Sequence, residues 1–79
     1  MKRALIIEDD ETYVRYLGKM LDRVQYKYHT AEDGVDGMRL IKNNDYDLIL
    51  LDLVMPGLDG EQVLRILKNR DVQTPVIVI

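Results

Sequence analysis

The chain has 79 residues, enough for one small domain, and we place that domain at residues 1–79. Hydrophobic residues make up 47% of the chain and charged residues 32%, which is too apolar for a disordered segment and too charged for a chain embedded in a bilayer. Eleven Lys and Arg against fourteen Asp and Glu give a formal net charge of -3, so the broad positive field that supports direct nucleic-acid binding is absent.

The beginning of the chain and its lack of cysteine indicate the compartment. Only four apolar residues, Ala4–Ile7, precede the first acids, which is too few for the core of a signal peptide. Without cysteine the chain forms no disulfide and no thiolate metal site. We therefore expect a cytoplasmic protein with no membrane partner.

The first half of the chain alternates between strand and helix patterns. Residues 3–7 form a short apolar run that predicts a buried strand, and four acids follow it directly. Apolar residues then recur at spacings of three and four, which predicts an amphipathic helix over residues 12–24. Residues 27–31 are rich in β-forming types and predict a second strand. A second helix is expected from Val35 to Asn43.

The second half continues the alternation. Residues 47–51 are almost entirely apolar, which is typical of a strand covered on both faces. Proline and glycine mark residues 53–60 as a loop, and residues 61–69 again have helical spacing. The aliphatic run at 75–79 predicts a final strand. The sequence thus predicts an α/β protein in the order β-α-β-α-β-α-β, with parallel strands and right-handed crossovers.

Carboxylates follow two of the predicted strands. Glu8, Asp9 and Asp10 come directly after the first strand, and Asp52 follows the third. Ligands of open α/β sheets bind beyond the carboxyl ends of the strands, so these acids are candidates for a common site. Grouped carboxylates raise one another's pKa unless a cation lies among them, and Mg²⁺ prefers such oxygen ligands. The pattern therefore predicts a magnesium site.

Capping is the simpler explanation of the same acids. Acidic residues in the first turn of a helix stabilise it, and Asp10 and Glu11 are assigned to that role. An Asp at the end of a strand, such as Asp52, also caps the loop that follows it. It is the combination of the two acidic positions that favours a metal site.

The segments IIEDD and LLDLVMPGLDG resemble the receiver domain of two-component response regulators. That family has an acidic pair after its first strand and, after its third, an Asp followed at fixed offsets by Met-Pro and Gly. The matching residues are Glu8, Asp9, Asp52, Met55, Pro56 and Gly60, with small residues at Ala31 and Gly34. The resemblance runs from Lys2 to Ile79 and implies a flavodoxin-like open parallel sheet with strand order 2-1-3-4.

The resemblance also implies a function and its residues. Asp52 becomes the phosphoacceptor that takes a phosphoryl group from a phosphohistidine on a sensor histidine kinase. The Mg²⁺ site comprises Asp9 as a direct ligand, Glu8 acting through water, Asp52, and the backbone carbonyl of Val54. Such a domain is a signalling module rather than a turnover enzyme, with at most weak autophosphorylation and autodephosphorylation.

The sequence departs from the family pattern at its end. The family has a fifth strand, two more helices, a switch Ser or Thr after the fourth strand and a Lys after the fifth, and this chain stops at Ile79. We therefore expect a truncated receiver whose phosphoryl transfer is slowed by the missing Lys. We also expect self-association through the aliphatic edge at Val76–Ile79.

Two alternative functions remain. In the first hypothesis the chain is an interaction or self-assembly module without phosphotransfer. In the second it is a Mg²⁺-dependent hydrolase. Haloacid-dehalogenase-type phosphatases place a second Asp where this chain has Val54, and no GK[ST] segment is present, so the hydrolase is disfavoured. The one histidine, His29, has no second ligand at motif spacing and is expected to be structural, as are the tyrosines.

Overall fold

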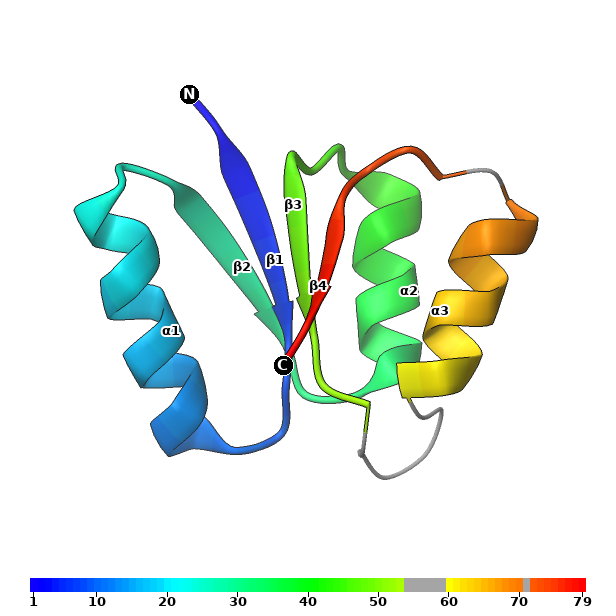
Figure 1. Cartoon of the computed structure of the whole chain (residues 1–79), viewed down its shortest axis with the longest axis horizontal. Coiled ribbons are helices and arrows are strands. Elements are labelled where there is room, and N and C mark those ends of the chain that lie inside the picture. Colours follow the sequence, from blue (N-terminus) through cyan, green and yellow to red (C-terminus); the bar gives the residue numbers. More distant parts are fainter. Residues whose placement is uncertain (54–59, 71) are drawn as a thin grey trace.

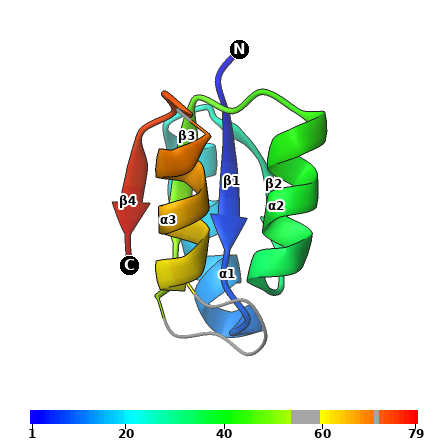
Figure 2. The same cartoon turned by 90° about the vertical axis from the view of Figure 1, so that its right-hand side faces the viewer.

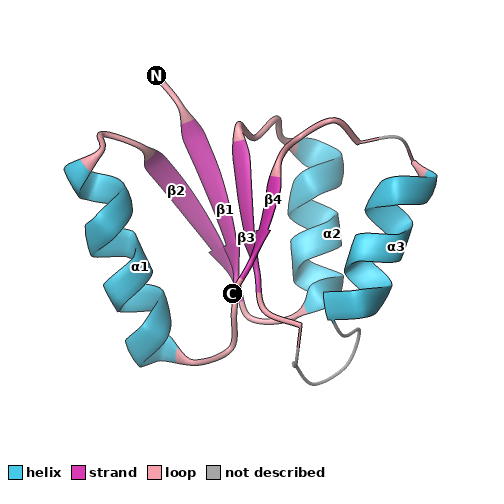
Figure 3. Cartoon of the chain, viewed as in Figure 1, coloured by secondary structure: helices cyan, strands magenta, loops and turns pink. Residues whose placement is uncertain are grey.

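The fold was analysed in a computed structural model that describes residues 1–53, 60–70 and 72–79. In this part of the chain four strands alternate with three helices, as the sequence predicts (Figure 3). In chain order the elements are β1 (Arg3–Ile7), α1 (Glu11–Arg23), β2 (Lys27–Ala31), α2 (Gly34–Asn43), β3 (Leu48–Leu51), α3 (Gly60–Asn69) and β4 (Val76–Val78).

Each predicted element is present, with small differences at the ends. Helix α1 begins at Glu11, one residue before its predicted start, because Asp10 rather than Glu11 is its N-cap. Strand β3 begins at Leu48, since the side chain and backbone of Asp47 bond to the start of β1 instead. None of the described helices is long and apolar enough to cross a membrane.

The four strands form one parallel sheet in the order β2-β1-β3-β4, which confirms the predicted order 2-1-3-4. Helix α1 covers one face of this sheet, and α2 and α3 lie side by side on the other (Figures 1 and 2). The register pairs Ile7 of β1 with both Ala31 of β2 and Leu51 of β3. Strands β1, β2 and β3 therefore end level with one another, and the residues after them emerge at one edge.

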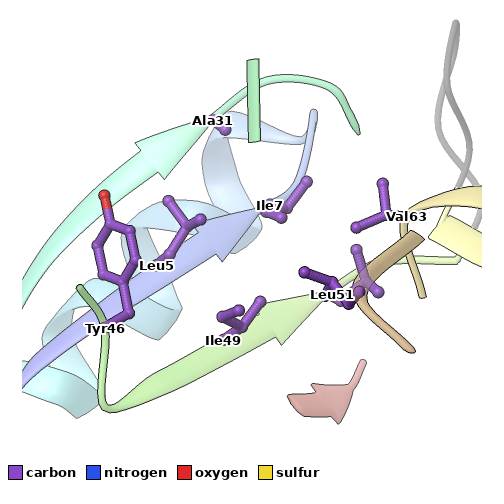
Figure 4. Close-up of a cluster of buried hydrophobic side chains, with 8 residues drawn as sticks. Leu5, Ile7, Ala31, Tyr46, Ile49, Leu51 and Val63 are labelled. Atoms are coloured by element: carbon purple, nitrogen blue, oxygen red, sulfur yellow. The ribbon is translucent and has the colours of Figure 1, made fainter. Parts of the chain in front are cut away.

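The apolar runs divide between two cores because successive side chains of a strand point to opposite faces. Leu5 and Ile7 of β1 join the cluster under α2 and α3, which also contains Ile49 and Leu51 of β3 (Figure 4). The alternate residues of β1 pack against Leu17 and Leu21 of α1 in a second cluster. A strand with a core on each face needs continuous rather than alternating apolar sequence, as β1 and β3 have.

Candidate metal centre

Glu8 and Asp52 are held at the carboxyl edge of the sheet by its hydrogen bonds. The Glu8 amide donates to the carbonyl of Ala31 at 3.0 Å, and the Asp52 amide donates to the carbonyl of Ile7 at 3.0 Å. Each residue thus continues the ladder by one step beyond the last strand residue. The two side chains are presented from adjacent strands at the same level.

Three carboxylates converge at this edge. One side-chain oxygen from each of Glu8, Asp9 and Asp52 lies within 4.8 Å of the other two. Glu8 is buried, with 6% of its surface exposed, Asp52 is half-buried and Asp9 is exposed. The cluster is therefore open to solvent on the Asp9 side and closed on the Glu8 side. Val54 lies outside the described residues.

The environment of Glu8 disfavours its charged form. Burial, a side-chain hydrogen bond with Asp52, and the charges of Asp52, Asp9 and Asp10 together raise the pKa of Glu8 to about 8. Its Oε2 atom is buried and has no hydrogen-bond partner within the described part of the chain. A buried polar atom without a partner costs free energy, and the water of a bound cation would offset that cost at this atom.

The residues present fit a hard divalent cation. Oxygens bound to one Mg²⁺ at about 2.1 Å lie at most about 4.2 Å apart, so carboxylate oxygens within 4.8 Å reach a common ion by small side-chain movements. A cation would oppose the negative charges that raise the pKa of Glu8. A metal-bound water could also donate to the unpartnered Oε2 atom.

Asp10 serves helix α1 and is not a member of the carboxylate cluster. Its Oδ1 atom accepts hydrogen bonds from the amides of Thr12 at 2.9 Å and Tyr13 at 3.3 Å. Glu11 occupies the first turn of the helix. The capping prediction for these two acids is confirmed. Within one acidic run, Glu8 and Asp9 therefore belong to the carboxylate cluster, and the two residues that follow them stabilise the helix.

An open hollow of about 340 Å³ adjoins the cluster between the start of α1 and the end of β2. Glu8 and Asp9 line it, together with Thr30, Glu32 and Arg15. The candidate site residues expected from the sequence follow only the first and third strands, so Thr30 and Glu32 are not among them. Strands β1 and β2 are parallel and end level with each other, so the residues after the second strand lie at the same edge as Glu8 and Asp9. The parallel order predicted from the sequence could have indicated their proximity to the site.

The family model of the response regulator receiver domain matches residues 4–79. The chain belongs to this family. It is 39% identical over 77 residues to the cell cycle response regulator CtrA of Brucella ovis, a match that covers 98% of this chain and 33% of that protein. The chain therefore spans about a third of the length of the curated relatives it matches.

Solved receiver structures agree with the fold. The receiver domain of the Francisella response regulator 1452 superposes with a TM-score of 0.93 at 32% identity, over 99% of this chain and 64% of that one. The response regulator TrrA of Thermotoga maritima, solved in complex with Mg²⁺ and BeF, superposes with a TM-score of 0.88 at 28% identity, over 99% of this chain and 66% of that one. The flavodoxin-like class predicted from the sequence is confirmed.

Proposed function

We propose that this chain is a Mg²⁺-dependent phosphoacceptor of two-component signal transduction that receives a phosphoryl group on Asp52 from a sensor histidine kinase. The observation that carries the proposal is the convergence of the Glu8, Asp9 and Asp52 carboxylates at the carboxyl edge of a receiver-family sheet. The similarity to TrrA, solved with Mg²⁺ and BeF, supports the choice of metal.

The chemistry assigns different roles to the three carboxylates. An oxygen of Asp52 attacks the phosphorus of the phosphohistidine, the phosphorus–nitrogen bond breaks, and its electrons return to the imidazole, which takes up a proton. The product is an acyl phosphate on Asp52. Asp9, Glu8 through water, and Asp52 are the proposed side-chain ligands of the metal, with the Val54 carbonyl as a fourth. When bound, Mg²⁺ supplies the positive charge that lets two anions approach.

The surroundings of the carboxylates favour Asp52 over Glu8 as the nucleophile. Glu8 is nearly inaccessible, and burial together with the neighbouring carboxylates raises its pKa and disfavours its charged form. Asp52 is half-buried and lies next to solvent-exposed Asp9. Attack on an external phosphoryl group requires a reachable oxygen, which Asp52 offers better than Glu8.

The test is phosphorylation by a small donor. After incubation with acetyl phosphate or phosphoramidate and Mg²⁺, intact-mass spectrometry should detect one added phosphoryl group. The Asp52→Ala variant should remain unmodified, and chelation of Mg²⁺ should prevent modification of the wild type. Asp33→Asn is the matched control, because Asp33 follows β2 near the same edge but caps α2 through Oδ1 and is outside the cluster. Phosphorylation that persists in Asp52→Ala would contradict the proposal.

In this role the chain is a signalling module whose own activities are limited to weak autophosphorylation and autodephosphorylation. We propose the cytoplasm as its location and the sensor kinase as its protein partner, with no direct nucleic-acid contact. The net charge of -3 agrees with the last point.

A second proposed function is that of an interaction or self-assembly module without phosphotransfer. The observation in its favour is the aliphatic strand β4 at one edge of the described sheet, where Ile77 is 51% and Val78 46% exposed. Absence of added mass in the acetyl phosphate experiment, combined with association through β4, would favour this module over the phosphoacceptor.

A further inference from the structure

Of the three carboxylates in the cluster, Asp9 is the one placed beyond the sheet. The main chains of Glu8 and Asp52 are tied to the strand ends by hydrogen bonds of 3.0 Å that their backbone amides donate. Asp9 follows Glu8 and is exposed, and the next ordered element along the chain is the cap of α1. The position of its carboxylate therefore depends on what fixes the main chain immediately after it.

That main chain is fixed by Asp10. Its Oδ1 atom accepts from the amides of Thr12 and Tyr13, and its carbonyl accepts from the amide of Val14 at 2.9 Å. The backbone at Asp10 is extended, with φ -82° and ψ 108°, so the chain turns from the sheet into the helix at this residue. Because Asp9 and Asp10 share a peptide group, the cap restricts the orientation of Asp9 as well.

We infer that Asp10 is a positioning residue for the metal site, whose cap on α1 keeps the Asp9 carboxylate within reach of the cation held by Glu8 and Asp52. This inference rests on the proposed function. It assigns Asp10 no contact with the metal or the phosphoryl group. Loss of the cap frees the connection between β1 and α1, and the cation then has to order that connection when it binds.

Two acidic helix caps in the described part of the chain provide a matched comparison. Asp33 caps α2 as Asp10 caps α1, with its Oδ1 accepting from the Asp36 amide at 2.8 Å, and it lies outside the carboxylate cluster. Serine keeps an N-cap acceptor without charge, whereas alanine has neither. Asp10→Ser and Asp10→Ala therefore have the same charge and differ in the cap, and Asp33→Ser and Asp33→Ala form the control pair.

The experiment is isothermal titration of Mg²⁺ into the whole chain and these four variants, at a temperature where circular dichroism shows each to be folded. We expect Asp10→Ala to bind Mg²⁺ about five-fold more weakly than Asp10→Ser. Without the cap, binding of the ion has to fix the main chain next to Asp9, and that ordering lowers the affinity. Asp33→Ala and Asp33→Ser should have equal Kd values, although both alanine variants should lower Tm.

The outcomes separate the two proposals. Equal Kd values for Asp10→Ala and Asp10→Ser, with wild-type binding intact, overturn the positioning role and leave the proposed function standing. A Kd that rises equally in the Asp10 and Asp33 alanine variants also overturns it, since the effect would then follow general stability. No Mg²⁺ uptake by the wild type overturns the proposed function and the positioning role together.

Discussion

Tyr46 and His29 form a polar pair beside the larger core cluster. The Tyr46 hydroxyl lies 2.7 Å from Nδ1 of His29, and the two rings meet edge to face with centroids 5.6 Å apart. Tyr46 is buried in the cluster that contains Leu5 and Ile49, and His29 lies on edge strand β2. The pair joins β2 to the segment before β3, and it lies outside the carboxylate cluster.

Substitution Tyr46→Phe tests the contribution of this pair. Removal of the hydroxyl should lower the free energy of unfolding by about 1 kcal/mol near neutral pH, because a partly buried hydrogen bond is lost. Burial raises the pKa of Tyr46, against the opposing charges of Arg3 and Arg39. The stability from the protonated phenol is therefore fully present below its unfolded pKa of 10.0 and is lost as the pH rises through the folded value.

Urea unfolding of the wild type and of Tyr46→Phe, at neutral pH and above pH 10, measures both effects. The difference between the two proteins should shrink as the pH rises, because only the wild type carries this phenol. Exposed Tyr16 provides the control, since Tyr16→Phe should change neither the stability nor its pH dependence by a comparable amount. A difference that stays constant with pH would contradict the role of Tyr46 in alkaline destabilisation.

At the scale of the elements, helix α1 ends in a Schellman arrangement with an unusual residue. The Tyr26 amide donates to the Leu21 carbonyl at 3.0 Å, and the Gln25 amide donates to the Asp22 carbonyl at 3.1 Å. Gln25 has a φ of 63°, in the left-handed region where glycine usually stands. A side chain in that region costs about 1–2 kcal/mol.

Substitution Gln25→Gly should therefore raise the free energy of unfolding by roughly 1 kcal/mol, after allowance for the greater freedom of glycine in the unfolded chain. Thermal unfolding followed by circular dichroism measures the change. Gln25→Ala keeps a Cβ at the same backbone angle and should give no such gain. Equal stability of the glycine and alanine variants would show that the backbone angle at Gln25 carries little strain.

Gly37 of helix α2 lies against the side chain of Ile7 of β1. A Cβ at this position would stand 2.7 Å from Cδ1 and 3.0 Å from Cγ1 of Ile7, which is fully buried. Gly37→Ala gains about 1 kcal/mol of helix propensity, but overpacking of a core costs typically 1–3 kcal/mol. The net change should be a loss of stability of about 1 kcal/mol.

The double variant Gly37→Ala with Ile7→Val tests the cause of that loss. Valine lacks Cδ1, the nearest contact, so the alanine should be better tolerated in the valine background than in the wild type. Urea unfolding of the two single variants and the double variant gives the coupling. Additive changes would place the cost of Gly37→Ala somewhere other than its contact with Ile7.

The arrangement of elements was predictable because apolar periodicity reports burial directly. The run at 47–51 and the run at 75–79 became central and edge strands of the sheet as expected, apart from their terminal residues. Gln25 was not predictable, since its left-handed angle is imposed by the bonds that close α1 and glycine is the usual signal. The need for a residue without a side chain at Gly37 was also not predictable, because the residue that it packs against, Ile7, is distant in sequence.

The candidate site was predictable in composition and only partly in geometry. Acids after two parallel strands indicate which edge carries the site, and the receiver motif distinguishes Asp52 from an ordinary cap. The sequence and its resemblance to receiver domains already assign Asp10 to the helix cap and Asp9 to the metal site, but the approach of the Asp9 carboxylate to Glu8 and Asp52 needs the three-dimensional turn between β1 and α1. The burial of Glu8 depends on the level ends of the strands, which no local pattern encodes.

At the scale of the whole molecule, the two edges of the described sheet differ in character. Edge strand β2 exposes Lys27, His29 and Thr30, and such polar and charged side chains discourage pairing with another sheet. Edge strand β4 exposes Ile77 and Val78 instead. An aliphatic edge with unpaired backbone groups is a surface that favours association with another chain.

We expect the 79-residue chain to self-associate through β4 at micromolar concentrations. Sedimentation velocity over a range of concentrations should show species larger than the monomer, and Ile77→Lys should shift the distribution toward the monomer because it places a charge on the exposed edge. Val35→Lys is the control, since Val35 is 64% exposed on α2 and not on β4, and it should leave the distribution unchanged. A well-folded wild-type monomer at these concentrations would exclude association through β4, and an equal shift in both lysine variants would assign the association to general surface hydrophobicity.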